Sequence, residues 1–165
     1  MKIGVLASGS GTNLQAIIDA IDNEIINDTE VAVVISNRKN AYALERARKN
    51  GIKDIYLNKN DFAGREEYDR KVVEILKEEG VDLVILAGYL RWITESFVNS
   101  FEGKIMNIHP SLLPSFKGLH GIEQAYEYGV KVTGVTVHFV DETEDGGPII
   151  LQEIVKIEEE DSIEM

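Results

Sequence analysis

The feature that most constrains the fold is a regular alternation of short, β-branched apolar runs with longer segments of helical period. Strands are expected at 3–7, 31–36, 55–57, 83–87, 104–108, 132–140 and 149–155, and helices at 12–21, 41–50, 65–79 and 122–128. Strand, helix and strand in succession favour parallel pairing through right-handed crossovers. The sequence therefore predicts an α/β fold with a doubly wound, mostly parallel sheet. The last two apolar runs are separated only by a short acidic loop, which predicts that the C-terminal strand is antiparallel.

Length and composition favour a single globular domain. The chain has 165 residues, of which 44% are hydrophobic and 28% are charged, and this is enough to bury a substantial core. We expect residues 1–157 to form the domain. Residues 158–165 carry five acids and no base, which predicts a solvated acidic tail.

Charge and cysteine usage exclude several classes of function. The net charge of −12 argues against nonspecific nucleic-acid binding, although a nest of backbone N–H groups can still bind a small anion. The lack of cysteine excludes disulfides, thiolate catalysis and Cys-ligated metals. The longest apolar runs, 31–35 and 83–87, are too short to span a bilayer, and the N-terminal run is too short for a signal peptide. We therefore expect a cytoplasmic protein without nucleic-acid or membrane partners.

A glycine-rich turn, Ser8-Gly9-Ser10-Gly11-Thr12-Asn13-Leu14, directly follows the first predicted strand and opens the first helix. Open parallel sheets bind ligands at the carboxyl ends of their strands, where this turn lies. Its glycines let the backbone approach an anion, and the helix start offers unpaired N–H groups. We therefore expect a phosphate-binding nest. Thr12 and Gln15 also fit a capping box, which would give these two side chains a purely structural use.

Two other phosphate-binding motifs fit this turn poorly. A dinucleotide fingerprint needs a third glycine where Leu14 stands, and a carboxylate after the second strand, which ends in Ser36-Asn37-Arg38. A Walker loop needs a Gly-Lys-Ser/Thr sequence that does not follow here. A monophosphate is therefore favoured, and a nucleotide-dependent oxidoreductase is the most distant alternative.

The second motif, Asn107-Ile108-His109-Pro110-Ser111-Leu112-Leu113-Pro114, begins at the end of a predicted strand. Strand alternation places the side chains of Asn107 and His109 on the same side, and two of the three prolines bracket the turn. An amide donor beside an imidazole at the carboxyl edge of a sheet can hold a developing oxyanion and move a proton. The motif therefore predicts catalysis.

The acidic loop Asp141-Glu142-Thr143-Glu144-Asp145-Gly146-Gly147-Pro148 supplies a candidate partner for His109. Two glycines follow Asp145, and they allow the loop to fold this carboxylate back onto the sheet edge. A carboxylate there would favour the cationic form of His109. We expect Glu142 and Glu144 to be solvated, and His120 and His138 to have packing or supporting roles. No spacing of His, Asp and Glu predicts a metal site.

Together these motifs resemble the phosphoribosylglycinamide formyltransferase family, the folate-dependent transformylases of purine synthesis. The resemblance rests on the glycine-rich turn, the Asn-His-Pro motif, Leu86-Ala87-Gly88-Tyr89-Leu90-Arg91, Gly118-Leu119-His120, and the segment 138–148. It runs in order from residue 1 to about residue 157. The Asn-His-Pro motif marks the wider superfamily, and its combination with the glycine-rich turn narrows the likeness to this family. The implied fold is the Rossmann-like formyltransferase sheet.

The resemblance implies an enzyme that transfers the formyl group of 10-formyltetrahydrofolate to the glycine amine of a ribonucleotide monophosphate, without a metal. It implies that Asn107, His109 and Asp145 are catalytic. Asn107 would donate a hydrogen bond to the oxyanion, and His109 would support its charge as an imidazolium. Asp145 would hold His109 protonated and help to relay the amine proton through water.

The resemblance also implies two sets of binding residues. The ribonucleotide would contact Gly11, Thr12, Asn13, Gly88, Ile108 and Pro110. The formyl folate would contact Arg65, Leu90, Arg91, Trp92, Ile93, Asn107, Asp141, Glu142, Thr143, Glu144 and Asp145. Trp92 and Leu86 would wall the folate pocket, with a plain core role as the alternative for each.

Members of this family usually continue into a C-terminal helix that contributes contacts to the acceptor. The resemblance implies that residues 1–157 are the catalytic domain and that this helix is absent from the 165 residues. A sheet face left uncovered would favour self-association, so a homodimer is an expected state.

Four alternatives stay open. A truncated module could bind folate or nucleotide with weak turnover or none. Among enzymes using formyltetrahydrofolate, methionyl-tRNA formyltransferase would need an additional basic C-terminal domain, and formyltetrahydrofolate hydrolase an additional N-terminal one. The oxidoreductase is the fourth.

Overall fold

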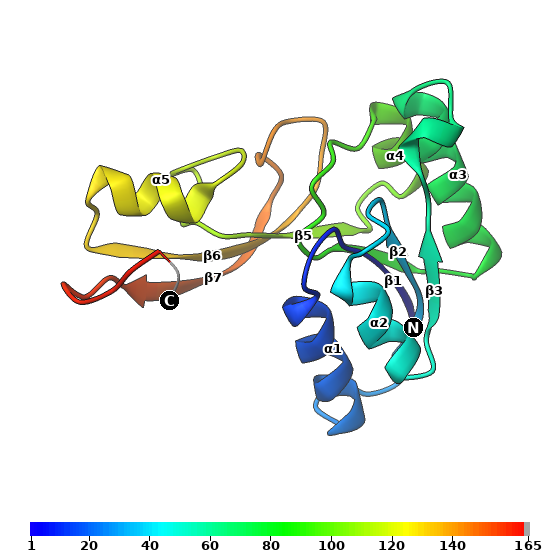
Figure 1. The fold of residues 1–165 in the computed structure, drawn as a ribbon, viewed down its shortest axis with the longest axis horizontal. Coiled ribbons are helices and arrows are strands. Elements are labelled where there is room, and N and C mark those ends of the chain that lie inside the picture. Colours follow the sequence, from blue (N-terminus) through cyan, green and yellow to red (C-terminus); the bar gives the residue numbers. More distant parts are fainter. Residues whose placement is uncertain (164–165) are drawn as a thin grey trace. The chain divides into compact units, whose positions relative to one another are not determined.

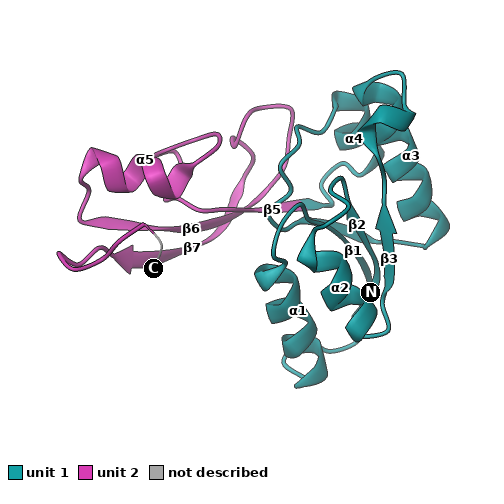
Figure 2. Ribbon diagram, in the orientation of Figure 1, with its two compact units in different colours: residues 1–105 teal, residues 106–165 magenta. Residues whose placement is uncertain are grey.

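The computed structural model describes residues 1–163 and divides into two compact units, residues 1–105 and 106–165 (Figure 2). Residues 164 and 165, the end of the predicted acidic tail, lie outside the described part. Seven strands occur in the sheet order β3-β2-β1-β4-β5-β6-β7, as expected for a doubly wound, mostly parallel fold.

The first unit alternates strands and helices (Figure 1). Its elements are β1 (Lys2–Leu6), α1 (Thr12–Asp22), β2 (Glu30–Ser36), α2 (Tyr42–Lys49), β3 (Lys53–Tyr56), a 3₁₀ turn η1 (Lys59–Asp61), α3 (Arg65–Glu78), β4 (Leu83–Leu86) and α4 (Glu95–Ser100). The second unit holds β5 (Ile105–His109, which begins at the last residue of the first unit), α5 (Gly121–Tyr128), β6 (Val132–Phe139) and β7 (Ile149–Lys156).

In the first unit, β1 pairs in parallel with β2 and β4, and both faces of this sheet are covered. Val5 of β1 is fully buried in a cluster with Leu14 of α1 and Leu44 of α2. Its neighbour Gly4 faces the other side, where an added Cβ would lie 2.5 Å from Leu76 at the end of α3. Coverage of both faces explains why β1, β2 and β4 are almost uniformly apolar rather than alternating.

The second unit is antiparallel, since β6 runs against both β5 and β7. Asn107 of β5 lies opposite His138 of β6, and His109 lies opposite Thr136. All eight residues of β7 are exposed, including Ile149, Leu151 and Ile154. The antiparallel strand expected at the C-terminal end is confirmed.

The predicted elements are found with ends shifted by one or two residues, but two short elements were missed. These are η1 and α4, which have three and six residues. The hydroxyl oxygen of Thr94 accepts a hydrogen bond from the N–H of Phe97 at 3.3 Å and caps α4. Six residues are too few to show a helical period in the sequence.

The capping box expected at Thr12 and Gln15 is wrong. The N-cap of α1 is Gly11, in a left-handed conformation with φ of 71°, and no side chain caps this helix. The amide of Gln15 instead donates to Asp19 at 2.8 Å and accepts from Arg46 at 3.3 Å. A left-handed residue at the N-cap turns the chain so that backbone N–H groups converge, as in an anion-binding nest.

Among residues 1–163, no helix is long and apolar enough to cross a membrane.

Candidate functional site

The glycine-rich turn of the first unit is fixed by contacts with α2. The N–H of Ala43 donates to the carbonyl oxygen of Gly9 at 3.1 Å, and the guanidinium of Arg46 donates to that of Ser10 at 2.8 Å. A Cβ at Gly11 would lie only 2.7 Å from the Cα of Ala43, so the close approach requires glycine. The turn is therefore preformed, and the first N–H groups of α1 have no intrahelical partner and no side-chain cap.

A second loop, residues 88–94, follows β4 and begins against this turn. The N–H of Ser8 donates to the carbonyl oxygen of Gly88 at 3.0 Å, and the N–H of Leu90 donates to the hydroxyl of Ser8 at 2.8 Å. The buried Ser8 hydroxyl in turn donates to the side-chain oxygen of Asn37 at 2.5 Å. Ser8 thus joins the glycine-rich turn to the start of the 88–94 loop.

The 88–94 loop alternates outward and inward side chains. Leu90 and Trp92 are 51% and 49% exposed, whereas the guanidinium of Arg91 lies 4.0 Å from the ring centroid of the buried Tyr68. The hydroxyl of Tyr89 and the Nε of Arg91 are buried and have no hydrogen-bond partner among the described residues. Burial raises the pKa of Tyr89 above its usual range, so this phenol stays a neutral donor. The loop therefore offers the exposed apolar side chains of Leu90 and Trp92 to a ligand.

His109, the last residue of β5 in the second unit, is 4% exposed and contacted through both ring nitrogens. Its Nε2 lies 2.9 Å from the carbonyl oxygen of Phe116, and its Nδ1 lies 3.6 Å from an oxygen of Asp145. A carbonyl oxygen can only accept, so Nε2 carries a proton. A second proton on Nδ1 would make the ring an imidazolium facing the Asp145 carboxylate.

The position of Asp145 depends on two glycines. Asp145 itself has a φ of 47°, and its carboxylate accepts a hydrogen bond from the N–H of Gly118 at 2.7 Å. A Cβ at Gly147 would lie 1.7 Å from the carbonyl oxygen of Phe139, and one at Gly146 would lie 2.1 Å from the hydroxyl of Thr143. Glycine at 147 lets the loop pass so close to β6, and glycine at 146 leaves room for the Thr143 side chain within the loop.

Asn107 is oriented by a histidine on the neighbouring strand. The amide nitrogen of Asn107 lies 3.3 Å from Nε2 of His138, and Nδ1 of His138 lies 2.9 Å from the carbonyl oxygen of Phe139. Nδ1 must therefore carry the proton, which leaves Nε2 to accept from Asn107. The second N–H of the Asn107 amide stays available to a ligand.

Comparison with known proteins identifies the family. The formyl transferase family model matches residues 1–165. A phosphoribosylglycinamide formyltransferase of Haemophilus influenzae is 47% identical over 163 residues, which are 99% of this chain and 76% of that protein. A glycinamide ribonucleotide transformylase 1 structure from Symbiobacterium toebii superposes with a TM-score of 0.96 at 50% identity, over 99% of this chain and 77% of the other.

The chain belongs to the formyl transferase family.

Some relatives are much longer proteins. The trifunctional purine biosynthetic protein adenosine-3 of Chironomus tentans is 45% identical over 164 residues, and this chain covers only 12% of its length. The formyl transferase chain thus spans about three quarters of its single-function relatives and a small part of the trifunctional ones.

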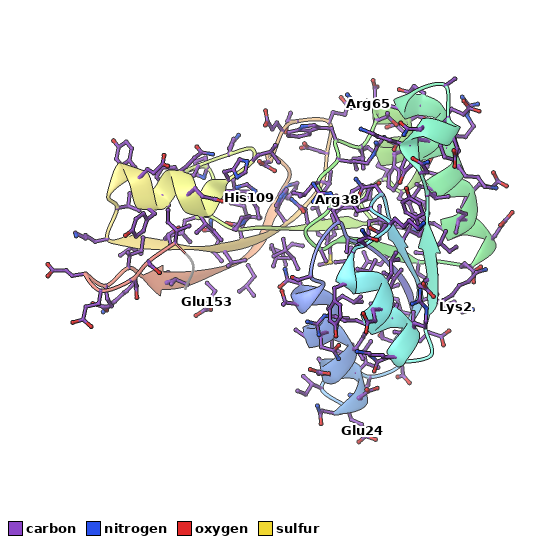
Figure 3. All side chains as sticks on the ribbon, viewed as in Figure 1. Lys2, Glu24, Arg38, Arg65, His109 and Glu153 are labelled. Atoms are coloured by element: carbon purple, nitrogen blue, oxygen red, sulfur yellow. The ribbon has the colours of Figure 1, made fainter. Side chains whose placement is uncertain are left out.

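The residues predicted for the site of this formyl transferase are distributed over both units. Gly11, Thr12, Asn13, Arg65, Gly88 and 90–93 belong to the first unit, and Asn107, Ile108, His109, Pro110 and 141–145 to the second. Within the second unit the structure brings Asp145 to His109. Arg65 is exposed at the start of α3 (Figure 3), and Glu142 and Glu144 are exposed as expected.

One side chain differs from its expected role, and another takes the alternative role that was expected for it. His120 does not pack, because its side chain is 73% exposed and lies 3.3 Å from the carboxylate of Glu123. Leu86 is buried in β4 and belongs to the core, which leaves Trp92 as the exposed member of the predicted pocket wall.

Sequence reasoning missed three contributors to the site. Ser8 lay within the recognised turn, but its bond to Leu90 spans 82 residues and leaves no local pattern. Nothing in the motif that contains Tyr89 predicts that its hydroxyl is buried. Phe116 acts through its carbonyl oxygen, which no side-chain pattern reveals.

Proposed function

We propose that this formyl transferase transfers the formyl group of 10-formyltetrahydrofolate to the glycine amine of 5-phosphoribosylglycinamide, a step of de novo purine biosynthesis. The observation that carries the proposal is the buried His109, which has Asp145 at one ring nitrogen and a donated hydrogen bond at the other. The names of the single-function relatives support the choice of acceptor.

The first unit supplies groups that fit the two proposed substrates. The preformed turn at Gly11 offers backbone N–H groups for the ribonucleotide phosphate, as helix starts commonly do. The exposed Leu90 and Trp92 fit the apolar faces of a flat heteroaromatic donor. When bound, the folate supplies the electrophilic formyl carbon.

The second unit supplies the groups for the chemistry. As the amine attacks, negative charge develops on the formyl oxygen, and the free N–H of Asn107 can stabilise it. His109 can donate its Nε2 proton to the same oxygen once that oxygen replaces the Phe116 carbonyl as acceptor. Asp145, 3.6 Å from Nδ1, can accept through water the proton that the amine loses. As the carbonyl re-forms, the bond between the formyl carbon and the folate nitrogen breaks, His109 takes back its proton, and the proton from the amine passes to the leaving nitrogen of tetrahydrofolate.

That the reaction needs no metal stays a prediction from the family resemblance. The cytoplasmic location and the homodimer stay predictions from the sequence.

The test is a direct assay of the purified chain with both substrates. We expect tetrahydrofolate and formylated ribonucleotide to form in equal amounts, and His109→Ala to lose this turnover. His120→Ala is the matched control, because the His120 side chain is exposed and its ring lies 3.3 Å from the carboxylate of Glu123 rather than against His109 or Asp145. Donor binding by the unaltered chain without any product would favour a folate-binding module instead.

A further inference from the structure

The 88–94 loop is held at its far end by a charged side chain that the proposed chemistry does not use. Asp69 of α3 is 2% exposed, and its carboxylate accepts a hydrogen bond from the N–H of Thr94 at 2.7 Å. Thr94 is itself buried and caps α4 through its hydroxyl. One buried carboxylate thus fixes both the end of the loop and the start of the next helix.

Burial of Asp69 is costly and is only partly offset. Burial raises the pKa of the Asp69 carboxyl, while the hydrogen bond from Thr94 and the positive charges of Arg91 and Arg65 oppose that rise. Arg91 lies within the loop and stacks on Tyr68, the residue before Asp69 on α3. An apolar side chain would avoid this desolvation cost but could not accept the hydrogen bond from Thr94, so the carboxylate ties α3 to the end of the loop.

The two ends of the loop are therefore held by buried acceptors from different elements. The Ser8 hydroxyl accepts from the N–H of Leu90, and the Asp69 carboxylate accepts from the N–H of Thr94. Between these two bonds the loop presents Leu90 and Trp92 outward. A loop held at both ends by buried polar contacts is preorganised, which lowers the entropic cost of ordering it around a ligand.

We propose that Asp69 is a positioning residue for the formyl-donor site: by fixing Thr94, it sets the backbone of residues 90–93 against which the folate binds. This inference rests on the proposed function, because it takes the 88–94 loop to be the donor-binding segment. Asp69 touches no substrate and acts through the loop.

The kinetic test separates donor binding from the other steps. We expect Asp69→Ala to raise the KM for 10-formyltetrahydrofolate about tenfold, as loss of a buried charged hydrogen bond predicts, with kcat and the acceptor KM changed less than about threefold. Asp69→Asn keeps an oxygen acceptor for Thr94 and should raise the donor KM about threefold. Glu74→Gln is the matched control, an exposed acid on the same helix paired with Lys71.

A second readout does not need turnover. Trp92 is the only tryptophan of the chain and lies in the loop itself, so its fluorescence reports on the loop directly. Acrylamide should quench Trp92 more strongly in Asp69→Ala and Asp69→Asn than in the unaltered chain or Glu74→Gln. The quenching comparison can be made even if the unaltered chain transfers no formyl group. Failure of the proposed function is therefore distinguishable from failure of the proposed role of Asp69.

The contradicting results are specific. Equal quenching in Asp69→Asn and the unaltered chain, with an unchanged donor KM, would overturn the proposal. A fall in kcat and a rise in both KM values, all by the same factor, would also overturn the proposal. If Asp69→Ala does not fold, the donor KM and the Trp92 quenching of Asp69→Asn test the proposal on their own.

Discussion

In the first unit, the candidate binding groups belong mainly to the main chain: the N–H groups around Gly11 and the backbone of residues 90–93. Buried side chains such as Ser8 hold these segments in place from behind. In the second unit, the candidate groups are the side chains of Asn107, His109 and Asp145, and it is the main chain, at Phe116 and Gly118, that holds them.

Because of this difference, mutations in the two units should affect different kinetic constants. A preformed main-chain surface binds the ground state of a ligand, so its distortion should change KM. Side chains that meet developing charge act mainly in the transition state, so their loss should lower kcat. The four predictions below test that division, from the largest expected effect to the smallest.

Removal of the imidazole should give the largest effect. We expect His109→Ala to lower kcat by about a thousandfold, within the usual range for a general acid or base, with both KM values changed less than about threefold. Steady-state kinetics measure this, and far-UV circular dichroism checks that the fold is kept. His120→Ala should match the unaltered enzyme, and near-normal turnover of His109→Ala would refute the mechanism.

A methyl group at Gly147 should damage catalysis without touching a catalytic side chain. Its Cβ would lie 1.7 Å from the carbonyl oxygen of Phe139, so the loop must move and carry Asp145 away from His109. We expect Gly147→Ala to lower kcat by about thirtyfold and to cost about 1–3 kcal/mol of stability. Kinetics and thermal unfolding measure both changes, and a stable variant with unchanged kcat would show that Asp145 is not held in this way.

A methyl group at Gly11 should affect binding instead. It would meet Ala43 at 2.7 Å and strain a residue whose φ is 71°. We expect Gly11→Ala to raise the acceptor KM about tenfold with little change in kcat, since such strain costs about 1–3 kcal/mol. Gly64→Ala is the control, because Gly64 is extended and no atom lies within 4 Å of the added Cβ. An unchanged acceptor KM in Gly11→Ala would show that the phosphate does not bind at this turn.

The smallest effect concerns pH. Burial raises the pKa of Asp69 above its ordinary 3.8 in the folded protein, so the folded state binds more protons than the unfolded state just above that pH. The contribution of Asp69 to stability is thus greatest below pH 3.8 and is lost as pH rises through the folded pKa. Asp69→Asn should flatten the free energy of unfolding over this interval, measured by urea denaturation at several pH values. A slope identical to that of the unaltered chain would contradict the shift.

Sequence patterns predict the long elements well and the short ones poorly. Strands such as β1 and β2 and the helix α3 are found because their apolar periods are unbroken over several residues. The 3₁₀ turn and α4 are too short to carry a period. The capping box at Thr12 failed because Gly11 adopts a left-handed conformation that moves the helix start.

In the candidate site, too, some features can be predicted from the sequence and others cannot. The two glycines after Asp145 were enough to predict that its loop could fold back, because glycine is needed only where the chain passes another closely. The roles of Ser8, Asp69 and the Phe116 carbonyl depend on partners brought near by the fold, and no local pattern encodes them.

The most direct test of the division between the units is a single-turnover experiment at saturating concentrations of both substrates. The unaltered chain, Gly11→Ala and Asp145→Asn are compared, and the rate of formyl transfer is followed by rapid quenching. The account predicts that Gly11→Ala transfers at nearly the unaltered rate and that Asp145→Asn is slower by about a hundredfold or more. A normal rate for Asp145→Asn, or an equal loss in Gly11→Ala, would contradict it.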